Sequence, residues 1–354
     1  GLYLNPKISV IIPTYNAKKY LMNSINSIMN QSIGFENIEI ILVDDNSKDG
    51  TKEMIIELSE KYENIKSYFL KENSGSASEP RNLGIRKSSA DYVMFLDSDD
   101  AFLPDMCEVM YNIIIRYDGE IVSCRFKQNK NGNNIVPYYS FGDFNPENFN
   151  NFKGKFEDGL IFVNSLNEFP ELLNLGCHSM VWNKIFKKEA IEKNKIKFPK
   201  GVYYEDVYFT TDFVFNSKNL IFLTDYFGYS YNIRQDEDAS VCQNFSQNMV
   251  EKQLKGFLAT MDLIKNNNYD RFKSELIVDL TKIYIYADLE KSYEKRFLKI
   301  MKPYYKNYSL FEKINTANLP FNIIINIFVK LFSLSDKIAS LSSKIYSKID
   351  KIKN

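Results

Sequence analysis

The sequence predicts an α/β protein with a mostly parallel sheet flanked by helices and a helical C-terminal extension. Over the first hundred residues, short apolar runs alternate with segments in which apolar residues recur at helical spacing. This alternation is typical of a parallel sheet covered by helices. Beyond about Asn248 the chain becomes helical in pattern and rich in lysine. Because 354 residues exceed what one core usually organises, we expect two parts, residues 1–248 and residues 249–354.

The expected strands are short, apolar runs with β-branched residues, and they cover 8–12, 38–43, 65–70 and 92–96. The expected helices between them cover 20–29, 52–62 and 79–87. The stretch from Asn129 to Lys155 has no clear period and predicts a long irregular connection. Pro303 and Pro320 are expected to break the C-terminal helices.

Composition excludes several classes of function. Lysine plus arginine and aspartate plus glutamate number 45 each, so no global field attracts nucleic acid, and no nucleic-acid partner is expected. The single histidine, His178, argues against histidine-based catalysis and leaves carboxylates as the acid and base groups. The four cysteines form no CxxC pair, and no signal-peptide pattern opens the sequence, which predicts reduced thiols and a cytoplasmic protein.

Polar clusters follow three of the expected strands: Thr14-Tyr15-Asn16, Asp44-Asp45-Asn46 and Asp97-Ser98-Asp99-Asp100. Ligands of parallel α/β sheets bind at the carboxyl ends of the strands, so we expect the clusters to line one crevice. The aspartates after the fourth strand are suited to hold a hard divalent ion on a diphosphate, or to form a turn or an N-cap for a helix from Ala101. Asp45 is suited to accept the imide N–H of uracil or to cap a helix, and Tyr15 to stack on a base or to be an ordinary loop residue.

Four segments in this order resemble the family 2 glycosyltransferases of the GT-A fold: Pro13-Thr14-Tyr15-Asn16, Asp44-Asp45-Asn46-Ser47, Asn73-Ser74-Gly75 with Arg81-Asn82-Leu83-Gly84, and Asp97-Ser98-Asp99. The resemblance covers about residues 7–240 and omits the C-terminal third. It implies a Rossmann-like GT-A sheet, a nucleotide-diphospho-sugar donor and inversion at the anomeric carbon. It also implies a divalent metal, Mn²⁺ or Mg²⁺, as the cofactor.

The resemblance also implies roles for individual residues. It places Pro13, Tyr15 and Asp45 around the nucleobase, Arg81 near the base and phosphates, Asp97 and Ser98 on the nucleotide sugar, and Asp99 on the metal. A metal held by Asp99 would neutralise the diphosphate and lower the barrier to its departure.

Further along, Tyr203-Tyr204-Glu205-Asp206-Val207 resembles the family's acidic motif. The resemblance implies that Asp206 is the base that deprotonates the acceptor, with Glu205 as the alternative base or an acceptor-binding neighbour. Arg234 and Ser240 resemble a segment that closes over the diphosphate, although the acidic run at 236–238 equally suits a solvated loop. The only tryptophan, Trp182, suits either a sugar-stacking or a core position.

The segment 321–354 is basic and amphipathic, with six lysines and two aspartates. Its apolar residues recur at spacings of three and four, which places them on one helical face. Its apolar start is shorter than the ~20 residues that span a bilayer. The face suits packing, a homo-oligomer contact, or peripheral contact with the cytoplasmic side of a membrane.

The resemblance implies a metal-dependent, inverting glycosyltransferase, and the habit of the family favours a UDP-sugar donor. The expected acceptor is a hydroxyl of a glycan, a polyol-phosphate or a lipid-linked molecule in surface polysaccharide or teichoic acid synthesis. The alternative is a catalytically inactive nucleotide-sugar-binding assembly protein on the same fold. A nucleotidyltransferase would need a Gly-rich phosphate loop that Pro13–Asn16 does not provide.

Overall fold

The computed structural model describes residues 5–130, 134–137, 145–174, 180–234, 247–269, 277 and 291–306. The chain divides into two compact units, one made of residues 1–138 and 143–235 and the other of residues 139–142 and 236–354. The boundary that the sequence suggests after residue 248 stays a prediction.

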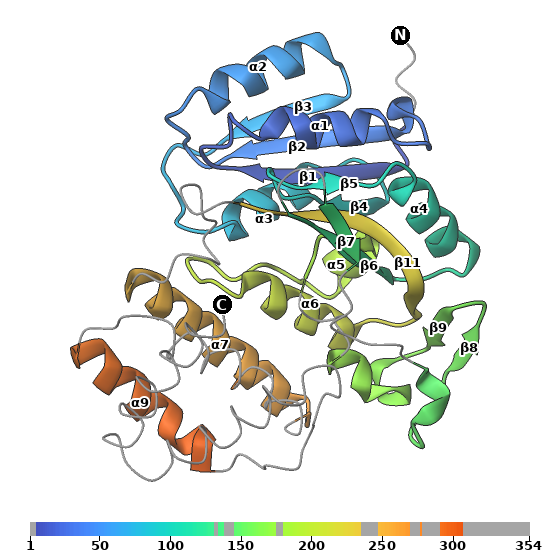
Figure 1. Ribbon diagram of the computed structural model, residues 1–354, viewed down its shortest axis with the longest axis vertical. Coiled ribbons are helices and arrows are strands. Elements are labelled where there is room, and N and C mark those ends of the chain that lie inside the picture. Colours follow the sequence, from blue (N-terminus) through green and yellow to red (C-terminus); the bar gives the residue numbers. More distant parts are fainter. Residues whose placement is uncertain are drawn as a thin grey trace. The chain divides into compact units, whose positions relative to one another are not determined.

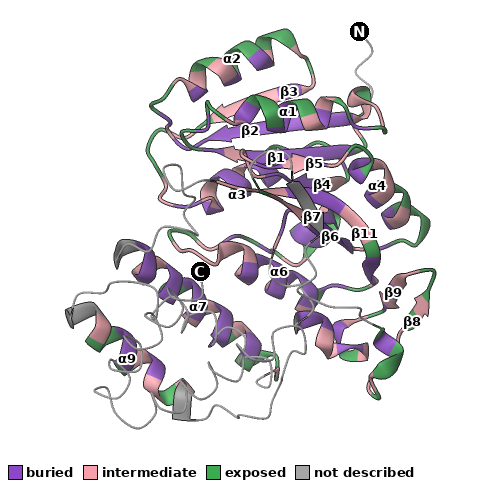
Figure 2. Cartoon of the chain, in the orientation of Figure 1, coloured by how far each residue is buried: buried purple, intermediate pink, exposed green. Residues whose placement is uncertain are grey.

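The N-terminal half of the sheet is parallel, as predicted (Figure 1). The strands β1 (Ile8–Thr14), β2 (Ile38–Asp44), β3 (Ile65–Phe69) and β4 (Tyr92–Phe95) pair in the order β3-β2-β1-β4, and all run in one direction. Strands β1 and β2 are buried along nearly their whole length (Figure 2), because helices cover both faces of such a sheet. The connecting helices are α1 (Leu21–Met29), α2 (Thr51–Lys61) and α3 (Ser78–Lys87).

The other half of the sheet brings one more strand end to the same edge. Strand β10 (Lys184–Lys187) pairs antiparallel with both β4 and β6 (Ile121–Lys130). Because β10 is antiparallel to both β4 and β6, β6 runs in the same direction as β4. Strand β11 (Leu220–Ile233), the parallel neighbour of β6, therefore also runs in the direction of β1 and β4. The carboxyl end of β11 therefore lies on the edge where β1, β2 and β4 end.

The structure of the segment after β4 differs from the one expected from the sequence. Ala101–Phe102 forms strand β5, which pairs with β11, and helix α4 starts only at Met106 and ends at Arg116. The aspartates at 97–100 thus belong to a turn between strands, and the interpretation of them as the cap of a helix from Ala101 is wrong. Pairing with β11 at Tyr229 and Ser230 overrides the helical periodicity of the local sequence.

The stretch expected to be irregular contains regular structure as well. Asn134–Pro137 forms β7, which pairs with β6, and Lys155–Glu157 forms β8, which pairs with β9 (Leu160–Val163). The remaining described elements of the first unit are η1 (Phe35–Asn37), η2 (Pro146–Asn148), η3 (Leu166–Glu168), η4 (Pro170–Asn174), α5 (Lys188–Lys193) and α6 (Glu205–Asn216).

The described part of the second unit contains the helices α7 (Gln247–Asn266) and α9 (Lys291–Lys306). Pro303 lies inside α9, so the expected break at this residue is wrong. The proline removes one intrahelical hydrogen bond, and the buried Leu298 and Met301 of the same helix provide packing that opposes this loss. Pro320 and the amphipathic segment 321–354 lie outside the described residues. None of the described helices has the length and apolar character needed to cross a membrane.

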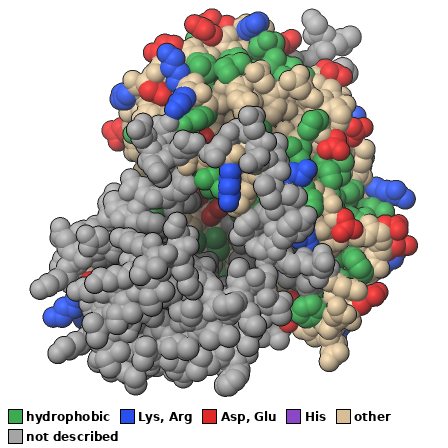
Figure 3. Space-filling view, viewed as in Figure 1, with side chains coloured by type: hydrophobic (Ala, Val, Ile, Leu, Met, Phe, Trp, Pro, Cys, Tyr) green, Lys and Arg blue, Asp and Glu red, His purple; other side chains and the backbone are tan. Residues whose placement is uncertain are grey.

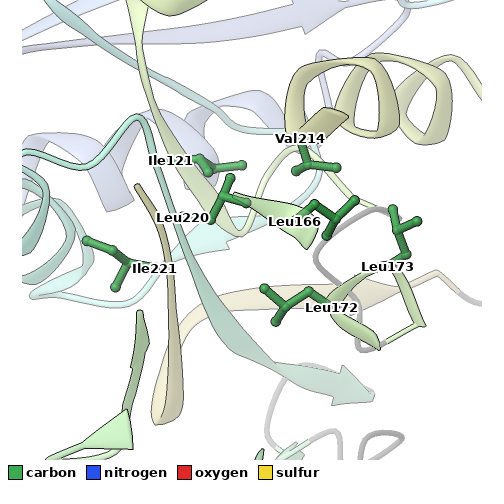
Figure 4. A pocket seen from close by; sticks show the side chains of 7 residues that line it. All are labelled: Ile121, Leu166, Leu172, Leu173, Val214, Leu220 and Ile221. Atoms are coloured by element: carbon green, nitrogen blue, oxygen red, sulfur yellow. The ribbon is translucent and has the colours of Figure 1, made fainter. Parts of the chain in front are cut away.

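The amino-terminal edge of the sheet holds a small apolar cavity of about 10 Å³ (Figure 4). It is lined only by aliphatic side chains, from the starts of β6 and β11, from α6 and from the η3 and η4 turns. Such a cavity stays dry and has no groups for a charged ligand. On the described part of the face in Figure 3, acidic and basic side chains are interspersed, in keeping with the formal net charge of zero.

Candidate functional site

The turns after β1 and β2 are tied together by side chains. Thr14 donates its hydroxyl to Asp44 Oδ1 at 2.9 Å, and the backbone N–H of Ser47 donates to Asp44 Oδ2 at 2.8 Å. Ser47 Oγ in turn accepts the backbone N–H of Asn16 at 2.9 Å. Tyr15 lies between these anchored residues and is 55% exposed, so its ring is available to a ligand.

Asp45 faces the loop that follows β3 instead of capping a helix. Its Oδ1 accepts the backbone N–H of Ser74 at 2.8 Å, and its Oδ2 accepts the Ser74 hydroxyl at 2.9 Å. Burial raises the pKa of Asp45, and the two bonds from Ser74 oppose that rise. Helix α2 begins after Gly50, and Asp49 accepts the N–H of Thr51, so within the segment 44–51 it is Asp49, not Asp45, that caps this helix.

Asp97 and Asp99, the first and third residues of the acidic turn 97–100, each pair with an arginine. Asp97 Oδ1 pairs with Arg81 at 2.9 Å, and Asp99 Oδ2 pairs with Arg234 Nε at 2.8 Å. Burial and the nearby charge of Asp97 raise the pKa of Asp99, while Arg234 lowers it. Arg234 reaches this turn because β11 ends on the same edge as β4.

The last residue of the turn, Asp100, anchors the turn to β11. Its Oδ2 accepts the hydroxyl of Tyr229 at 2.7 Å, and its Oδ1 accepts the backbone N–H of Asn232 at 2.8 Å. Burial, followed by the charges of Asp99 and Asp97, raises the pKa of Asp100 well above its usual value. Trp182 stacks on Tyr229 with ring centroids 4.1 Å apart and is 6% exposed. Trp182 is therefore a core residue that supports the turn, and its interpretation as a sugar-stacking residue is wrong.

Arg81 connects the acidic turn to the start of α6. Its second terminal nitrogen donates to Glu205 Oε1 at 3.1 Å, while the first holds Asp97. The side chain is 5% exposed, and its guanidinium carbon lies 5.3 Å from the centre of the Phe198 ring. Since Arg81 and Glu205 are 124 positions apart, this pair joins two distant segments of the chain.

Neighbours of Arg81 on α3 explain its position. Asn82 accepts the N–H of Phe198 and donates to its carbonyl, both at 2.9 Å, which fixes the segment that leads to α6. A Cβ at Gly84 would overlap the side chain of Ile11 in β1, so glycine allows α3 to lie close against the sheet.

The acidic pair begins α6. Tyr204, the residue before the helix, has a left-handed backbone with φ 62°, which is uncommon for a residue with a side chain. Asp206 Oδ1 accepts the backbone N–H of Val207 at 2.9 Å. Burial, and next the charge of Glu205, raise the pKa of Asp206 to about 7. Burial also raises the pKa of Glu205, against the lowering effect of Arg81.

Six predicted site residues are thus brought together by the contacts at this edge: Asp97, Asp99, Arg81, Glu205, Arg234 and, next to Glu205, Asp206. Ser98 contributes its backbone carbonyl, which accepts the Ser24 hydroxyl at 2.9 Å. Pro13 lies near the end of β1, and Ser240 lies outside the described residues.

The sequence interpretation assigned no site role to four residues that hold the site, namely Asn82, Asp100, Tyr229 and Asn232. Asn82 and Asp100 lie within the segments 81–84 and 97–100, and Asn232 lies two residues before Arg234, so a local signal was present for these three. Tyr229 has no local signal, because its role depends on where β11 ends.

Among the described residues, no cluster of three or more His, Cys, Asp or Glu side chains could hold a metal by itself. Asp97 and Asp99 nevertheless supply oxygen donors of the kind that Mg²⁺ and Mn²⁺ prefer. The two carboxylates fit such an ion when a diphosphate completes its ligands.

The sequence of the chain is similar to those of known proteins. Residues 9–169 match the sequence profile described as "Glycosyl transferase family 2". The chain is 35% identical over 222 residues to the poly(ribitol-phosphate) beta-N-acetylglucosaminyltransferase TarP of Staphylococcus aureus, a match that covers 62% of this chain and 61% of TarP. It is 30% identical over 231 residues to the poly(ribitol-phosphate) beta-glucosyltransferase of Bacillus spizizenii, covering 65% of this chain and 33% of that protein. The chain thus spans about three fifths or less of the length of these relatives.

The fold has solved counterparts. The structure of S. aureus TarS 1–349 in complex with UDP-GlcNAc has a TM-score of 0.64 at 19% identity, covering 97% of this chain and 92% of that one. The mannosyltransferase PcManGT from Pyrobaculum calidifontis, in complex with GDP-Man and Mn²⁺, has a TM-score of 0.53 at 14% identity, covering 98% and 88%. At these identities the likeness concerns the fold alone. With the sheet, the four ordered motifs and the matched profile in agreement, this chain has the GT-A fold, and its residues 9–169 form a domain that matches glycosyl transferase family 2.

Proposed function

We propose that this protein transfers a sugar from a UDP-sugar to an acceptor hydroxyl, with inversion at the anomeric carbon. The acceptor class that we favour is a polyol-phosphate polymer of the teichoic acid type. The observation that carries the proposal is the bridge formed by Arg81, which links the acidic turn to the acidic start of α6. A donor-binding group and a base are thereby held in one rigid arrangement.

Asp206 is the base in this proposal, and Glu205 is its positioning neighbour. Glu205 is held by Arg81 at 3.1 Å, whereas no described lysine or arginine forms an ion pair with Asp206. A base works best when its pKa lies near the working pH, and the pKa of Asp206 is raised to about 7. Asp206 therefore takes the proton of the acceptor hydroxyl as that oxygen bonds to the anomeric carbon.

The donor lies along the turns after β1, β2 and β4 in this proposal. The exposed ring of Tyr15 stacks on the base, with Pro13 beside it, and Asp45 accepts the imide N–H of uracil. Asp97 and Ser98 contact the nucleotide sugar, and Arg81 holds Asp97 in position for this contact. Support for uridine comes from TarS, whose solved complexes contain UDP-GlcNAc and UDP.

Asp99 is the residue that would hold a divalent metal, with Asp97 two positions before it. When bound, Mn²⁺ or Mg²⁺ would neutralise the diphosphate and so favour its departure. The fit rests on the oxygen donors of the turn, and the Mn²⁺ in PcManGT offers support from a protein of the same fold.

The acceptor class rests on the relatives. TarP and the Bacillus spizizenii enzyme are both named as transferases that act on poly(ribitol-phosphate). GgaA of Bacillus subtilis, 28% identical over 293 residues, is named as a minor teichoic acid biosynthesis protein. A glycan or a lipid-linked acceptor is the alternative within the same reaction class.

Calorimetric titration with UDP, GDP, dTDP and CDP, each with and without Mn²⁺, tests the donor class. We expect UDP to bind selectively and more tightly with Mn²⁺, and binding of GDP in preference to UDP would contradict the assignment of Tyr15 and Asp45. Incubation with UDP-sugars and poly(ribitol-phosphate) then tests transfer, and the anomeric configuration of the product tests inversion. UDP binding without any transfer would favour the inactive assembly protein.

A further inference from the structure

The ion pair between Asp99 and Arg234 occupies the carboxylate that the proposed function assigns to the metal. Arg234 Nε donates to Asp99 Oδ2 at 2.8 Å, and the side chains of Arg234 and Asp99 are 25% and 16% exposed, respectively. The guanidinium carbon lies 4.8 Å from the centre of the Tyr20 ring. Arg234 is thus held by an acid and by an aromatic face, both partly shielded from water.

We propose that Arg234 is a built-in competitor of the divalent ion, bound to Asp99 in the donor-free enzyme and released from it when the metal binds. The proposal rests on the proposed function, in which Asp99 is the metal ligand. It concerns what the protein does with this carboxylate before the donor arrives.

Charge explains why a competitor is needed. The turn places Asp97, Asp99 and Asp100 within four residues, and the side chains of Asp99 and Asp100 are largely shielded from water. Arg81 neutralises Asp97, and Arg234 does the same for Asp99. Without Arg234, Asp99 would be a largely buried carboxylate with two acidic neighbours, which is a strong attractor for any cation.

The backbone next to Arg234 limits the movement that release requires. Asn232, two residues earlier, donates its N–H to Asp100 Oδ1 at 2.8 Å and its side-chain amide to the Asp99 carbonyl at 2.6 Å. These bonds keep the end of β11 on the turn while the long Arg234 side chain changes partner. The exchange therefore needs only rotation of one side chain, and the strand pairing stays intact.

The change of partner by Arg234 determines how metal binding and donor binding depend on each other. When no donor is present, a divalent ion that binds Asp99 displaces Arg234, and the displaced guanidinium gains no new partner. When a diphosphate is present, the released guanidinium gains phosphate oxygens, which it binds well. Metal alone should therefore bind weakly, and metal with donor should bind strongly, so the two ligands are positively coupled.

The test measures Mn²⁺ affinity without nucleotide, from the electron paramagnetic resonance signal of free Mn²⁺. Arg234→Met keeps the length of the side chain and removes its charge, and we expect it to tighten Mn²⁺ binding about tenfold, a typical effect of losing a close charge partner. Tyr20→Leu removes the aromatic support and should tighten binding by a smaller factor. Arg116→Met is the matched control, because Arg116 also lies over a tyrosine ring, at 5.3 Å from Tyr117, but away from the turn.

The outcomes separate this proposal from the proposed function. Unchanged or weaker Mn²⁺ binding by Arg234→Met, while Asp99→Asn abolishes the binding seen in the unaltered protein, would overturn the competitor role and leave the metal role of Asp99 standing. If Asp99→Asn binds Mn²⁺ as well as the unaltered protein, both roles fall. If Arg116→Met tightened Mn²⁺ binding by the same factor, the effect would come from the loss of any positive charge on the protein. This result would also overturn the proposal.

Discussion

The two acidic segments of the site differ in how their carboxylates are partnered. In the turn 97–100, Asp97 and Asp99 each face an arginine, and Asp100 accepts a hydroxyl and a backbone N–H. At the start of α6, Arg81 pairs with both Glu205 and Asp97, whereas Asp206 accepts only the backbone N–H of Val207 from the described residues.

This difference separates two chemical tasks. Carboxylates with fixed arginine, hydroxyl or N–H partners are held in one position, which suits ligand binding. A buried carboxylate next to another acid has a raised pKa, which suits proton transfer near neutral pH. The four predictions below test this division, starting with the largest expected effect.

Asp206→Asn should reduce transfer by about 10²- to 10⁴-fold, because the amide cannot accept the acceptor's proton. Nucleotide affinity should stay near that of the unaltered protein. Steady-state kinetics and calorimetry check the two statements. Asp212→Asn is the control, since Asp212 lies on the same helix and burial raises its pKa as well. Full activity in Asp206→Asn together with loss in Glu205→Gln would move the base to Glu205.

Arg81→Leu should destabilise the fold by about 3–5 kcal/mol, because Asp97 and Glu205 would lose a buried partner. Urea denaturation measures the change in free energy of unfolding. The exposed Arg116→Leu should change it by no more than about 0.5 kcal/mol. Adding Glu205→Gln to Arg81→Leu should recover part of the loss, and strict additivity of the two changes would contradict the bridge.

Tyr229→Phe should cost about 1–3 kcal/mol of stability, because Asp100 Oδ2 loses a buried donor. The same variant should weaken nucleotide binding, since the acidic turn loses an anchor to β11. A thermal shift and a UDP titration measure both effects. Tyr226→Phe serves as the comparison, because the Tyr226 hydroxyl donates to Asp105 instead of the turn. Equal nucleotide affinities in the two variants would contradict the anchoring role.

Glu205→Gln should move the rising limb of the pH–activity profile to lower pH. The charge of Glu205 raises the pKa of Asp206, and its removal lowers that pKa. The unaltered protein should therefore gain activity as pH rises through about 7, where Asp206 loses its proton, and the variant should gain it earlier. A profile that keeps its midpoint would show that another group controls the rate.

The sequence predicted the parts of the molecule that depend on local pattern. The buried runs that became β1 and β2 are apolar on both faces, and their polar ends mark the binding edge. The expected motif residues 13–16, 44–47, 81–84 and 97–99 follow from the resemblance, which is confirmed over residues 9–169.

Features that depend on long-range contacts escaped prediction. The partner of Arg81 is 124 positions away, and Asp99 meets Arg234 only because two antiparallel pairings turn β11 to the same edge. Ala101–Phe102 became a strand through pairing with β11, and Pro303 stayed in a helix whose packing outweighs the lost bond. The roles of individual site residues stay predictions until they are measured.

The position of the only tryptophan gives the protein an optical reporter of its own. Trp182 stacks on Tyr229, whose hydroxyl holds Asp100 in the acidic turn. Indole emission responds to changes in the stacking and polarity around the ring, and no second tryptophan contributes a background. Rearrangement of the turn on ligand binding can therefore be followed in real time, by stopped-flow fluorescence of the unlabelled protein.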